Sequence, residues 1–285
     1  MANRPVYVPI SRPPFYQKVD VEFTFNPGFS PAQKRRNIEA IHQEFLRRSP
    51  DGNPLEISSK SLNPLGVNLS AFNLKKQIGS LKIEIPVENV YQGGKKFVCG
   101  GPYTDLYYVS PKEAKRDERL QNGGALRAFS FEGVDYPTEP SNGFYDWIYI
   151  QAVQENKEMG EEIQNYNAFT DIEFNPNKSI NCQARAAAMF VGIAKAGLLD
   201  MTRDFYDFCK LISRKSNIVF NTPAVEKAKT VSEPTPTVTF SEGQVIKHPT
   251  FGEGKIISVN GEILKIQFSC GEKTLGAKWV REKCR

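Results

Sequence analysis

The sequence predicts an α+β fold, in which a helix-rich domain is followed by a small all-β domain closed as a barrel. Up to residue 213, amphipathic helical stretches alternate with short strand-like stretches. Beyond residue 240, only short apolar stretches broken by glycine remain. A proline-bearing stretch separates the two patterns, so we expect a first domain over 1–215, a linker over 216–239 and the β-barrel over 240–285.

The composition excludes several classes of protein. No apolar run reaches the roughly 18 residues that a membrane span needs, and residues 1–11 lack the apolar core of a secretion signal, so we expect a cytoplasmic protein. The five cysteines are widely spaced without a C-x-x-C pair, and there are two histidines. We therefore expect no disulfide framework, metal site, His-based triad or bound cofactor. The net charge of +5 is compatible with a nucleic-acid partner and does not require one.

Caps and periodicity predict the elements of the first domain. Ser30 and Pro31 begin a helix whose apolar stripe is Ile38, Ile41, Phe45 and Leu46. Ser110 and Glu113 form a capping box that leads into a helix over 114–120. Further helices are expected over 144–156, 180–196 (stopped by Gly197) and 201–213. Strands are expected over 19–25, 82–85 and 126–131 in the first domain, and over 244–246, 255–259 and 263–268 in the second.

The most informative polar pattern is formed by Glu88, Gln92 and Lys95. They stand at i, i+4 and i+7, which places them on one face of a helix. Gly93 and Gly94 within this stretch cost a helix about 1 kcal/mol each, which a close approach of ligand or backbone would explain. The alternative is a solvated polar face carrying an ordinary Glu/Lys pair.

Several segments resemble the NADAR, or YbiA-like, family. Residues 88–97 resemble its E-H-Y-F-Q-A-Q-K-F segment, residues 69–73 its L-S-N-F-Y and residues 110–119 its S-P-x-x-A-K-x-x-G-R. Asp146 and Trp147 resemble its D-W helix, and Asp171 and Asn181 the acidic residue of its D-x-x-W-G loop and the asparagine that follows. The resemblance implies a helix-rich α+β domain that cleaves N-glycosidic bonds.

The whole of residues 1 to about 214 more closely resembles the NADAR antitoxins paired with DarT-type toxins. The segments of greatest weight are 55–61, 101–107 and 179–185. Three positions depart from the broad family: Asn89 replaces its histidine, Asp117-Glu118 its glycine context, and residues 172–174 its W-G. These departures fit the toxin-associated branch better than the riboflavin-pathway branch. The resemblance implies reversal of guanine ADP-ribosylation in DNA.

The residue types at these positions are suited to the chemistry of that reaction. Cleavage of a ribose–nitrogen bond passes through an oxocarbenium-like state, which a carboxylate near the anomeric carbon stabilises. Glu88 is the expected carboxylate. Lys95 either orients ligand oxygens as a cation or, if its pKa is lowered, forms an imine with the anomeric carbon. Asp171 either holds the ribose hydroxyls, acts as the second carboxylate, or is an ordinary turn aspartate.

The resemblance also implies a substrate-binding set: Ser70, Phe72, Asn73, Gln92, Trp147, Asn181 and Arg185. Three of these have simpler explanations. Trp147 either stacks on a base or packs in the core. Asn181 either contacts substrate or satisfies backbone groups, and Arg185 either meets phosphate or is a surface arginine.

The C-terminal segment has a resemblance of its own. Residues 243–256 resemble the G-x-x-V-x-H-x-x-F-G-x-G-x-V opening of the Tudor-like module that ends UvrD/PcrA-type helicases, and His248 is expected to be a structural turn residue. In that group the module binds RNA polymerase. The lysines and arginines of this segment outnumber its glutamates, which fits either an acidic partner or a solvated surface.

Together these observations predict an N-glycosidase that removes ADP-ribose from guanine bases in DNA, as the antitoxin to a DarT-type toxin. Its expected partners are ADP-ribosylated DNA, the toxin, and RNA polymerase or nucleic acid through the C-terminal barrel. One alternative is an N-glycosidase for a small intermediate of riboflavin synthesis. Another is a non-catalytic adaptor that holds nucleic acid or polymerase through its basic tail.

Overall fold

The computed structural model describes residues 1–28, 30–175, 181–213, 240–248, 252–260, 263–268, 271–276 and 280. The chain divides into two units, Met1–Thr222 and Pro223–Arg285, each described here by itself. The linker predicted over 216–239 lies outside the described residues. Within the described ranges, no helix is both long enough and apolar enough to span a membrane.

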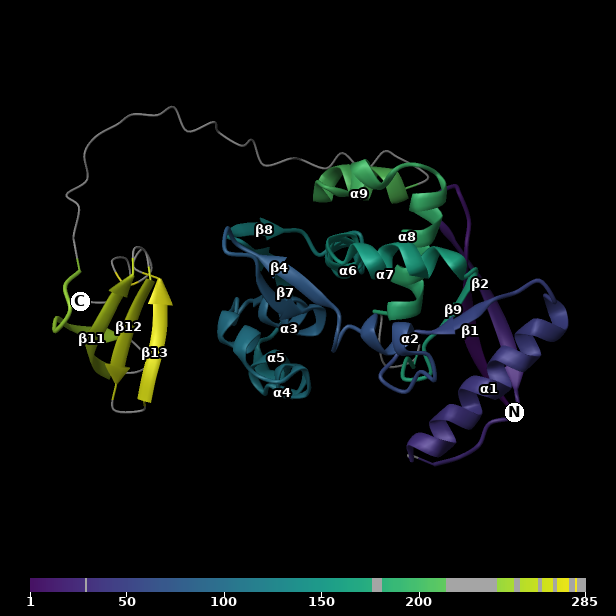
Figure 1. Cartoon of the computed structure of the whole chain (residues 1–285), viewed down its shortest axis with the longest axis horizontal. Coiled ribbons are helices and arrows are strands. Elements are labelled where there is room, and N and C mark those ends of the chain that lie inside the picture. The colour runs from purple at the N-terminus through teal and green to yellow at the C-terminus, as the bar shows by residue number, and fades with distance from the viewer. Residues whose placement is uncertain are drawn as a thin grey trace. The chain divides into compact units, whose positions relative to one another are not determined.

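A four-stranded sheet forms one side of the first unit (Figure 1). Its strand order is β2-β1-β9-β3, with bounds Tyr16–Phe23, Ala2–Pro9, Ala168–Thr170 and Pro54–Glu56. β1 and β2 pair antiparallel over their whole length, whereas β3 runs parallel to β9. The strand expected over 19–25 therefore begins earlier, at Tyr16, and its partner β1 was not predicted.

Helix α1 (Pro31–Arg48) packs on this sheet and begins as predicted. Ser30 accepts a hydrogen bond from the backbone N–H of Gln33, whose side chain accepts from the backbone of Ser30, so the capping box is complete. The apolar stripe faces inward: Ile38, Ile41 and Phe45 join a cluster with Val6, Val21, Phe23, Ala168 and Ile172.

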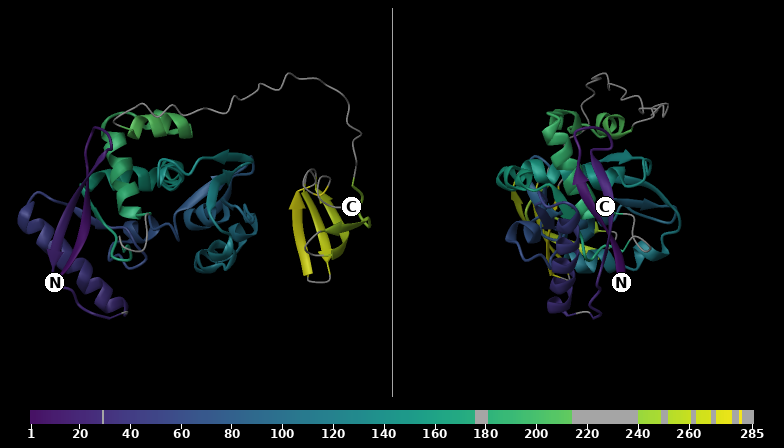
Figure 2. Two further views of the ribbon diagram at one scale, coloured as in Figure 1. Left: turned by 180° about the vertical axis from the view of Figure 1, so that it is seen from behind. Right: turned by 90° about the vertical axis from the view of Figure 1, so that its right-hand side faces the viewer.

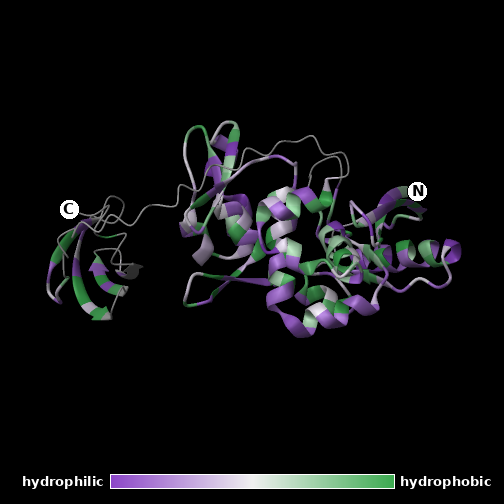
Figure 3. Cartoon of the chain, turned by 90° about the horizontal axis from the view of Figure 1, so that it is seen from above, coloured by the Kyte–Doolittle hydropathy of each residue, from purple (hydrophilic) through white to green (hydrophobic). Residues whose placement is uncertain are grey.

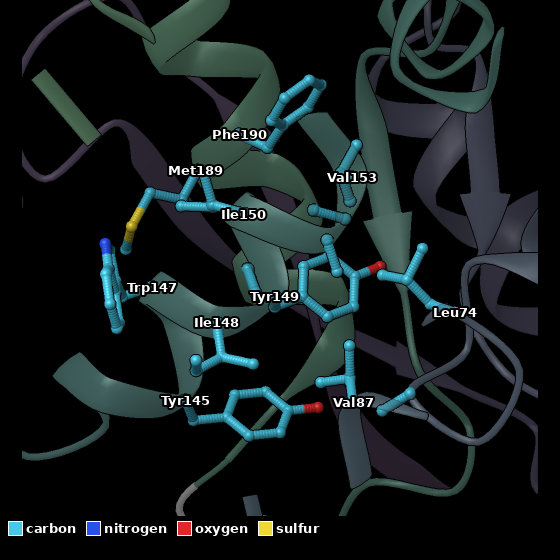
Figure 4. Packing of buried hydrophobic residues seen from close by; sticks show 14 of the residues in the cluster. Leu74, Val87, Tyr145, Trp147, Ile148, Tyr149, Ile150, Val153, Met189 and Phe190 are labelled. Atoms are coloured by element: carbon cyan, nitrogen blue, oxygen red, sulfur yellow. The ribbon is translucent and has the colours of Figure 1, made fainter. Parts of the chain in front are cut away.

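Two helices form the centre of the unit: α6 (Gly143–Glu155) and α8 (Gln183–Lys195). Both are apolar on most faces, which is typical of fully buried helices. Figure 4 shows Trp147, Tyr149 and Met189 in the core that they share. The β1–β2 hairpin runs beside α8 (Figure 2), so closely that a Cβ on Gly192 would lie 2.2 Å from the carbonyl oxygen of Phe15. α8 is followed by Gly197 with φ of 71°, as the predicted stop requires.

Shorter elements surround these helices. The remaining strands of the first unit are β4 (Lys75–Ile78), β5 (Ile83–Pro86), β6 (Lys95–Phe97), β7 (Leu126–Phe131) and β8 (Val134–Tyr136). The remaining helices are α2 (Pro64–Asn68), α3 (Val87–Gly93), α4 (Pro111–Arg116), α5 (Arg119–Asn122), α7 (Lys157–Glu162) and α9 (Phe205–Ile212), with 3-10 turns η1 (Thr104–Tyr108), η2 (Ile163–Asn165) and η3 (Leu199–Thr202).

Two predicted helices are each divided by an aspartate. The capping box of Ser110 and Glu113 is present, but the helix expected over 114–120 breaks at Asp117, whose carboxylate accepts the N–H of Arg119. The helix expected over 201–213 divides in the same way, because Asp204 caps α9 through the N–H groups of Tyr206 and Asp207. In both cases a side-chain oxygen competes with the helical hydrogen bonds.

The second unit contains an open four-stranded sheet in the order β10-β11-β12-β13. Its strands are Val245–His248, Gly252–Asn260, Ile263–Phe268 and Gly271–Gly276, so the three predicted strands are confirmed. The prediction of a closed barrel is wrong for the described residues, where no pairing joins β10 to β13. Residues alternate between hydrophilic and hydrophobic along the strands (Figure 3), and one face buries Ile246, Ile256, Leu264, Ile266, Phe268 and Val280. Closure requires a strand number and tilt that four short strands do not supply.

Candidate active site

A cavity of about 570 Å³ lies against α3, β7 and the segment after β9. Six of the predicted site residues line it: Phe72, Glu88, Gln92, Lys95, Asp171 and Asn181. The structure therefore brings together residues that lie far apart in the sequence. The other walls come from Tyr91, Lys115, Phe129, Tyr145 and Gln183, among others.

Glu88, Gln92 and Lys95 form a continuous hydrogen-bonded chain. The Gln92 amide donates to Glu88 Oε1 at 2.8 Å, and Lys95 Nζ donates to Gln92 Oε1 at 2.7 Å. The predicted helical face holds for the first two residues only, because α3 ends at Gly93 and Lys95 begins β6. Lys95 reaches the same hydrogen-bonded chain from a strand. The interpretation as a solvated Glu/Lys pair is wrong, because Glu88 is only 5% exposed.

The two glycines at this corner serve packing within the protein. A Cβ on Gly93 would lie 2.6 Å from the ring of Tyr107 and 2.9 Å from the carbonyl oxygen of Tyr103. A Cβ on Gly94 would lie 2.9 Å from the carbonyl oxygen of Ser130. Both glycines thus allow a close approach of neighbouring segments of the same polypeptide. The sequence had suggested a close approach of either ligand or backbone, and the backbone explanation applies.

Lys95 is partly buried, beside an aromatic ring and a second cation. Its Nζ lies 4.6 Å from the centre of the Tyr91 ring. Burial lowers the pKa of Lys95 to about 8; the Glu88 carboxylate opposes this effect and Lys115 adds to it. Lys115, on α4, approaches the same carboxylate, with 3.5 Å between Nζ and Glu88 Oε1. The sequence contained its signal, as the lysine of the S-P-x-x-A-K match, yet Lys115 was not predicted as a site residue.

Asp171 follows β9 and is both a turn aspartate and a cavity residue. Its Oδ1 accepts the backbone N–H groups of Glu173 at 3.0 Å and Phe174 at 3.1 Å, while Oδ2 accepts the amide of Gln183 at 3.1 Å. Burial, together with the nearby carboxylate of Glu56, raises the pKa of Asp171 to about 7 against these hydrogen bonds. Near neutral pH it can therefore hold a proton.

Aromatic rings form much of the cavity wall. Tyr91 packs on Phe129 and Tyr145, with ring centres 5.3 Å and 5.2 Å apart. Burial raises the pKa of Tyr91 to about 12, and its side chain is hydrogen-bonded to that of Asn181. Asn181 thus contacts the cavity wall, and the phenols remain neutral hydrogen-bonding groups at physiological pH.

Trp147 and Arg185 lie elsewhere. Trp147 packs in the core, where its Nε1 donates to the carbonyl oxygen of Thr202 at 2.9 Å. Arg185 lies under the protein surface and donates to both oxygens of Asp146, at 2.8 Å and 2.9 Å. Neither lines the cavity. The structure therefore favours the core explanation for Trp147, and it gives Arg185 a buried carboxylate in place of a phosphate.

Ser70 and Asn73 belong to a tight turn that presents Phe72. The carbonyl oxygen of Ser70 accepts the N–H of Asn73 at 2.8 Å, and the Asn73 amide donates to the carbonyl oxygen of Val67 at 2.9 Å. Phe72 lines the cavity, with Lys115 Nζ 5.5 Å from its ring centre. Of the L-S-N-F-Y-like segment, the aromatic residue alone lines the cavity.

Acidic and sulfur ligands are not gathered into a metal site in the described ranges, where no group of three or more His, Cys, Asp or Glu side chains could hold an ion. Cys99, Cys182 and Cys209 are free thiols. Burial raises the pKa of Cys182, so this thiol lacks the thiolate character that metal binding or nucleophilic attack requires.

Comparison with known families identifies the family of the first unit. Residues 2–219 match the family described as DarT1-associated NADAR antitoxin. The matched range includes every residue that lines the cavity and ends before the strands of the second unit. Among curated proteins, none matches the chain.

Proposed function

The chain belongs to the DarT1-associated NADAR antitoxins, and on this premise we propose that it hydrolyses the bond between ADP-ribose and the amino group of guanine in DNA. Membership of the family supports an antitoxin role and a DarT-type toxin as its counterpart. The observation that carries the proposed chemistry is the pairing of two carboxylates, Glu88 and Asp171, with the amine of Lys95 in one aromatic-walled cavity.

Glu88 is suited to the developing charge at the anomeric carbon. As the C–N bond weakens, positive charge spreads over that carbon and the ring oxygen, and a buried carboxylate stabilises it. Gln92 and Lys115 hold one oxygen of Glu88, at 2.8 Å and 3.5 Å. The carboxylate can also accept a proton from the nucleophile.

Asp171 is suited to protonate the leaving base. The electron pair of the broken C–N bond stays on nitrogen, which needs a proton, and a carboxylic acid with a pKa of about 7 can donate one near neutrality. Overall, the hydroxyl group of one water molecule joins the anomeric carbon, and the other proton of that water passes to Glu88. Asp171 gives its proton to the base, and the proton taken up by Glu88 returns to Asp171 through solvent, so that the net change is the addition of one water. The products are free ADP-ribose and unmodified guanine.

The remaining walls suit a nucleotide. Phe72, Tyr91 and Phe129 line the cavity, and aromatic side chains are the usual partners of an extruded base. Lys115 lines the cavity although 57% of its side chain is exposed, which is the placement expected of a cation that meets a diphosphate arriving from solvent. A volume of about 570 Å³ is within the usual range of ligand sites.

The experiment compares wild type with Glu88→Gln on an oligonucleotide that carries one ADP-ribosylated guanine. We expect the substitution to lower the single-turnover rate by ~10²–10⁴-fold, because it removes the charge and the proton acceptor. The matched control is Glu84→Gln, on the exposed face of β5 and outside the cavity, which should retain the wild-type rate. A folded Glu88→Gln protein that turns over like the control would refute the assignment.

A further inference from the structure

Glu56 is a buried carboxylate next to the cavity that the proposed reaction does not use. It ends strand β3 and is only 1% exposed. Its two oxygens accept three hydrogen bonds: Oε1 from the Ser58 hydroxyl at 2.6 Å and from the Ile172 backbone N–H at 2.8 Å, and Oε2 from the Thr170 hydroxyl at 2.6 Å. Burying a charge is costly unless it is satisfied in this way, so a carboxylate kept here requires a reason.

The contacts of Glu56 bracket Asp171 in the chain. Thr170 is the residue immediately before Asp171, and Ile172 is the residue immediately after it. β3 runs parallel to β9 with Glu56 opposite Thr170, so the carboxylate stands directly beside the segment that it holds. Glu56 therefore fixes the backbone on both sides of Asp171 at the point where that side chain enters the cavity.

We propose that Glu56 is a positioning residue for Asp171: it anchors the two neighbours of Asp171 and, as a second buried carboxylate, keeps on Asp171 the proton that the leaving guanine takes. This inference rests on the proposed function, in which Asp171 is the acid. Two neighbouring carboxylates in a buried site do not both ionise readily. Each carboxylate accepts three hydrogen bonds, but those of Glu56 are shorter, at 2.6–2.8 Å against 3.0–3.1 Å for Asp171. Asp171 lines the cavity and can pass a proton to a ligand.

The surrounding charged groups bear on which of the two carboxylates, Glu56 or Asp171, holds the proton. Burial and then Glu56 itself raise the pKa of Asp171 to about 7. Burial raises the pKa of Glu56 as well, and the hydrogen bonds from Ser58, Thr170 and Ile172 oppose this rise. The negative charge of Glu173 adds to it, although Lys34 of α1 lies 3.5 Å from Glu173. His42 of α1 reaches Glu56 only through Thr170, with 2.8 Å between Nε2 and Oγ1. Burial lowers the pKa of His42 to about 4, so it stays neutral above pH 5.

The hydrogen-bond chain makes Glu56→Gln an isosteric test. In the native protein Thr170 donates to Glu56, so His42 Nε2 must donate to Thr170. A glutamine can keep its oxygen toward Ser58 and Ile172 and turn its amide toward Thr170. Thr170 then donates to His42, which as a neutral imidazole can adopt the other tautomer. The variant thus removes the charge and leaves each group a partner.

The experiment measures the titration of Asp171 directly. Wild type, Glu56→Gln and an exposed control, Glu158→Gln, are labelled with ¹³C at the aspartate carboxyl groups and followed from pH 5 to 9, with Asp171→Asn to identify the signal. We expect the midpoint of Asp171 to fall by more than half a pH unit in Glu56→Gln and to stay at the wild-type value in Glu158→Gln. The fall of kcat at high pH should move with it, while KM changes little.

A midpoint of Asp171 that is unchanged or higher in Glu56→Gln would overturn the inference. If that variant does not fold, Thr170→Val replaces it: the loss of one donor makes Glu56 compete for the proton, so the Asp171 midpoint should again fall. Lys95 also titrates in this range. If kcat still falls at high pH in Asp171→Asn, that fall is due to Lys95, which would contradict the role of Asp171 as the acid. Failure of wild type to hydrolyse the adduct contradicts the proposed function instead, because the titration does not depend on turnover.

Discussion

Lys95 is the residue whose chemistry depends most on its surroundings. An ordinary lysine is about 0.03% neutral at pH 7, whereas a pKa of about 8 leaves roughly a tenth of the amine neutral. Burial is the largest cause of this change. The ribose attached to guanine can open to an aldehyde-level carbon, with which a neutral amine can form an imine. The lowered pKa makes the imine route available to Lys95, and we propose this route over a purely cationic role.

The substitution Lys95→Arg separates these two roles. Arginine keeps the charge but does not lose its proton and does not form an imine. We expect Lys95→Arg and Lys95→Ala to lose turnover alike, and borohydride to trap a covalent adduct on wild type during the reaction. Lys96→Arg, on the exposed lysine paired with Asp135, is the control and should behave as wild type. Substantial hydrolysis by Lys95→Arg would exclude the imine route.

At the scale of elements, one buried ion pair joins the two central helices. Asp146 of α6 and Arg185 of α8 are 4% and 11% exposed in their side chains, and the guanidinium contacts both carboxylate oxygens. α6 carries Tyr145 and α8 begins with Gln183, both of which line the cavity. The ion pair therefore fixes the positions of α6 and α8 relative to each other, and with them the two cavity walls that Tyr145 and Gln183 form.

Loss of this pair should be costly to the fold. Asp146→Asn leaves Arg185 buried without its carboxylate, so we expect the free energy of unfolding in urea to fall by about 3–5 kcal/mol. The matched control is Asp200→Asn, which breaks the exposed pair with Arg203 (80% and 86% exposed) and should cost under ~1 kcal/mol. Equal losses in the two variants would show that the buried pair has no special weight.

The elements that the sequence predicted are those with strong local signals. The capping boxes at Ser30 and Ser110 predicted where helices begin, since caps act within one turn. Strands β3 and β9, of three residues each, are too short to show a period, and their parallel pairing joins distant segments. The contact of Glu56 with Thr170 was accordingly not predictable from the sequence. The selection of Glu88 and Asp171, which both line the cavity, was possible through the family resemblance.

At the scale of the whole molecule, the two units have separate cores. The second unit buries its own apolar face, centred on Leu264 and Ile266, and the cavity residues all belong to the first. The second unit also lies beyond residues 2–219, which the family match covers. Its resemblance to a Tudor-like module, and the polymerase or nucleic-acid partner implied by it, stay predictions.

Removal of residues 240–285 should therefore leave hydrolysis of a short modified oligonucleotide unchanged. We expect the shortened protein to keep the wild-type kcat, because every wall of the cavity remains. Binding to long DNA should weaken, and more so at low salt, if the lysines of the tail contact phosphates. Loss of turnover on the short substrate would show that the second unit completes the active site.

Cleavage of the bond between ADP-ribose and guanine changes the mass of the oligonucleotide, so the masses after reaction are the decisive measurement. Wild-type protein is incubated with a short DNA carrying one ADP-ribosylated guanine, and both products are analysed by mass spectrometry. We expect free ADP-ribose and a DNA strand that has the mass of the unmodified sequence and retains its guanine. An intact adduct, or a strand with an abasic site where the guanine stood, would contradict it.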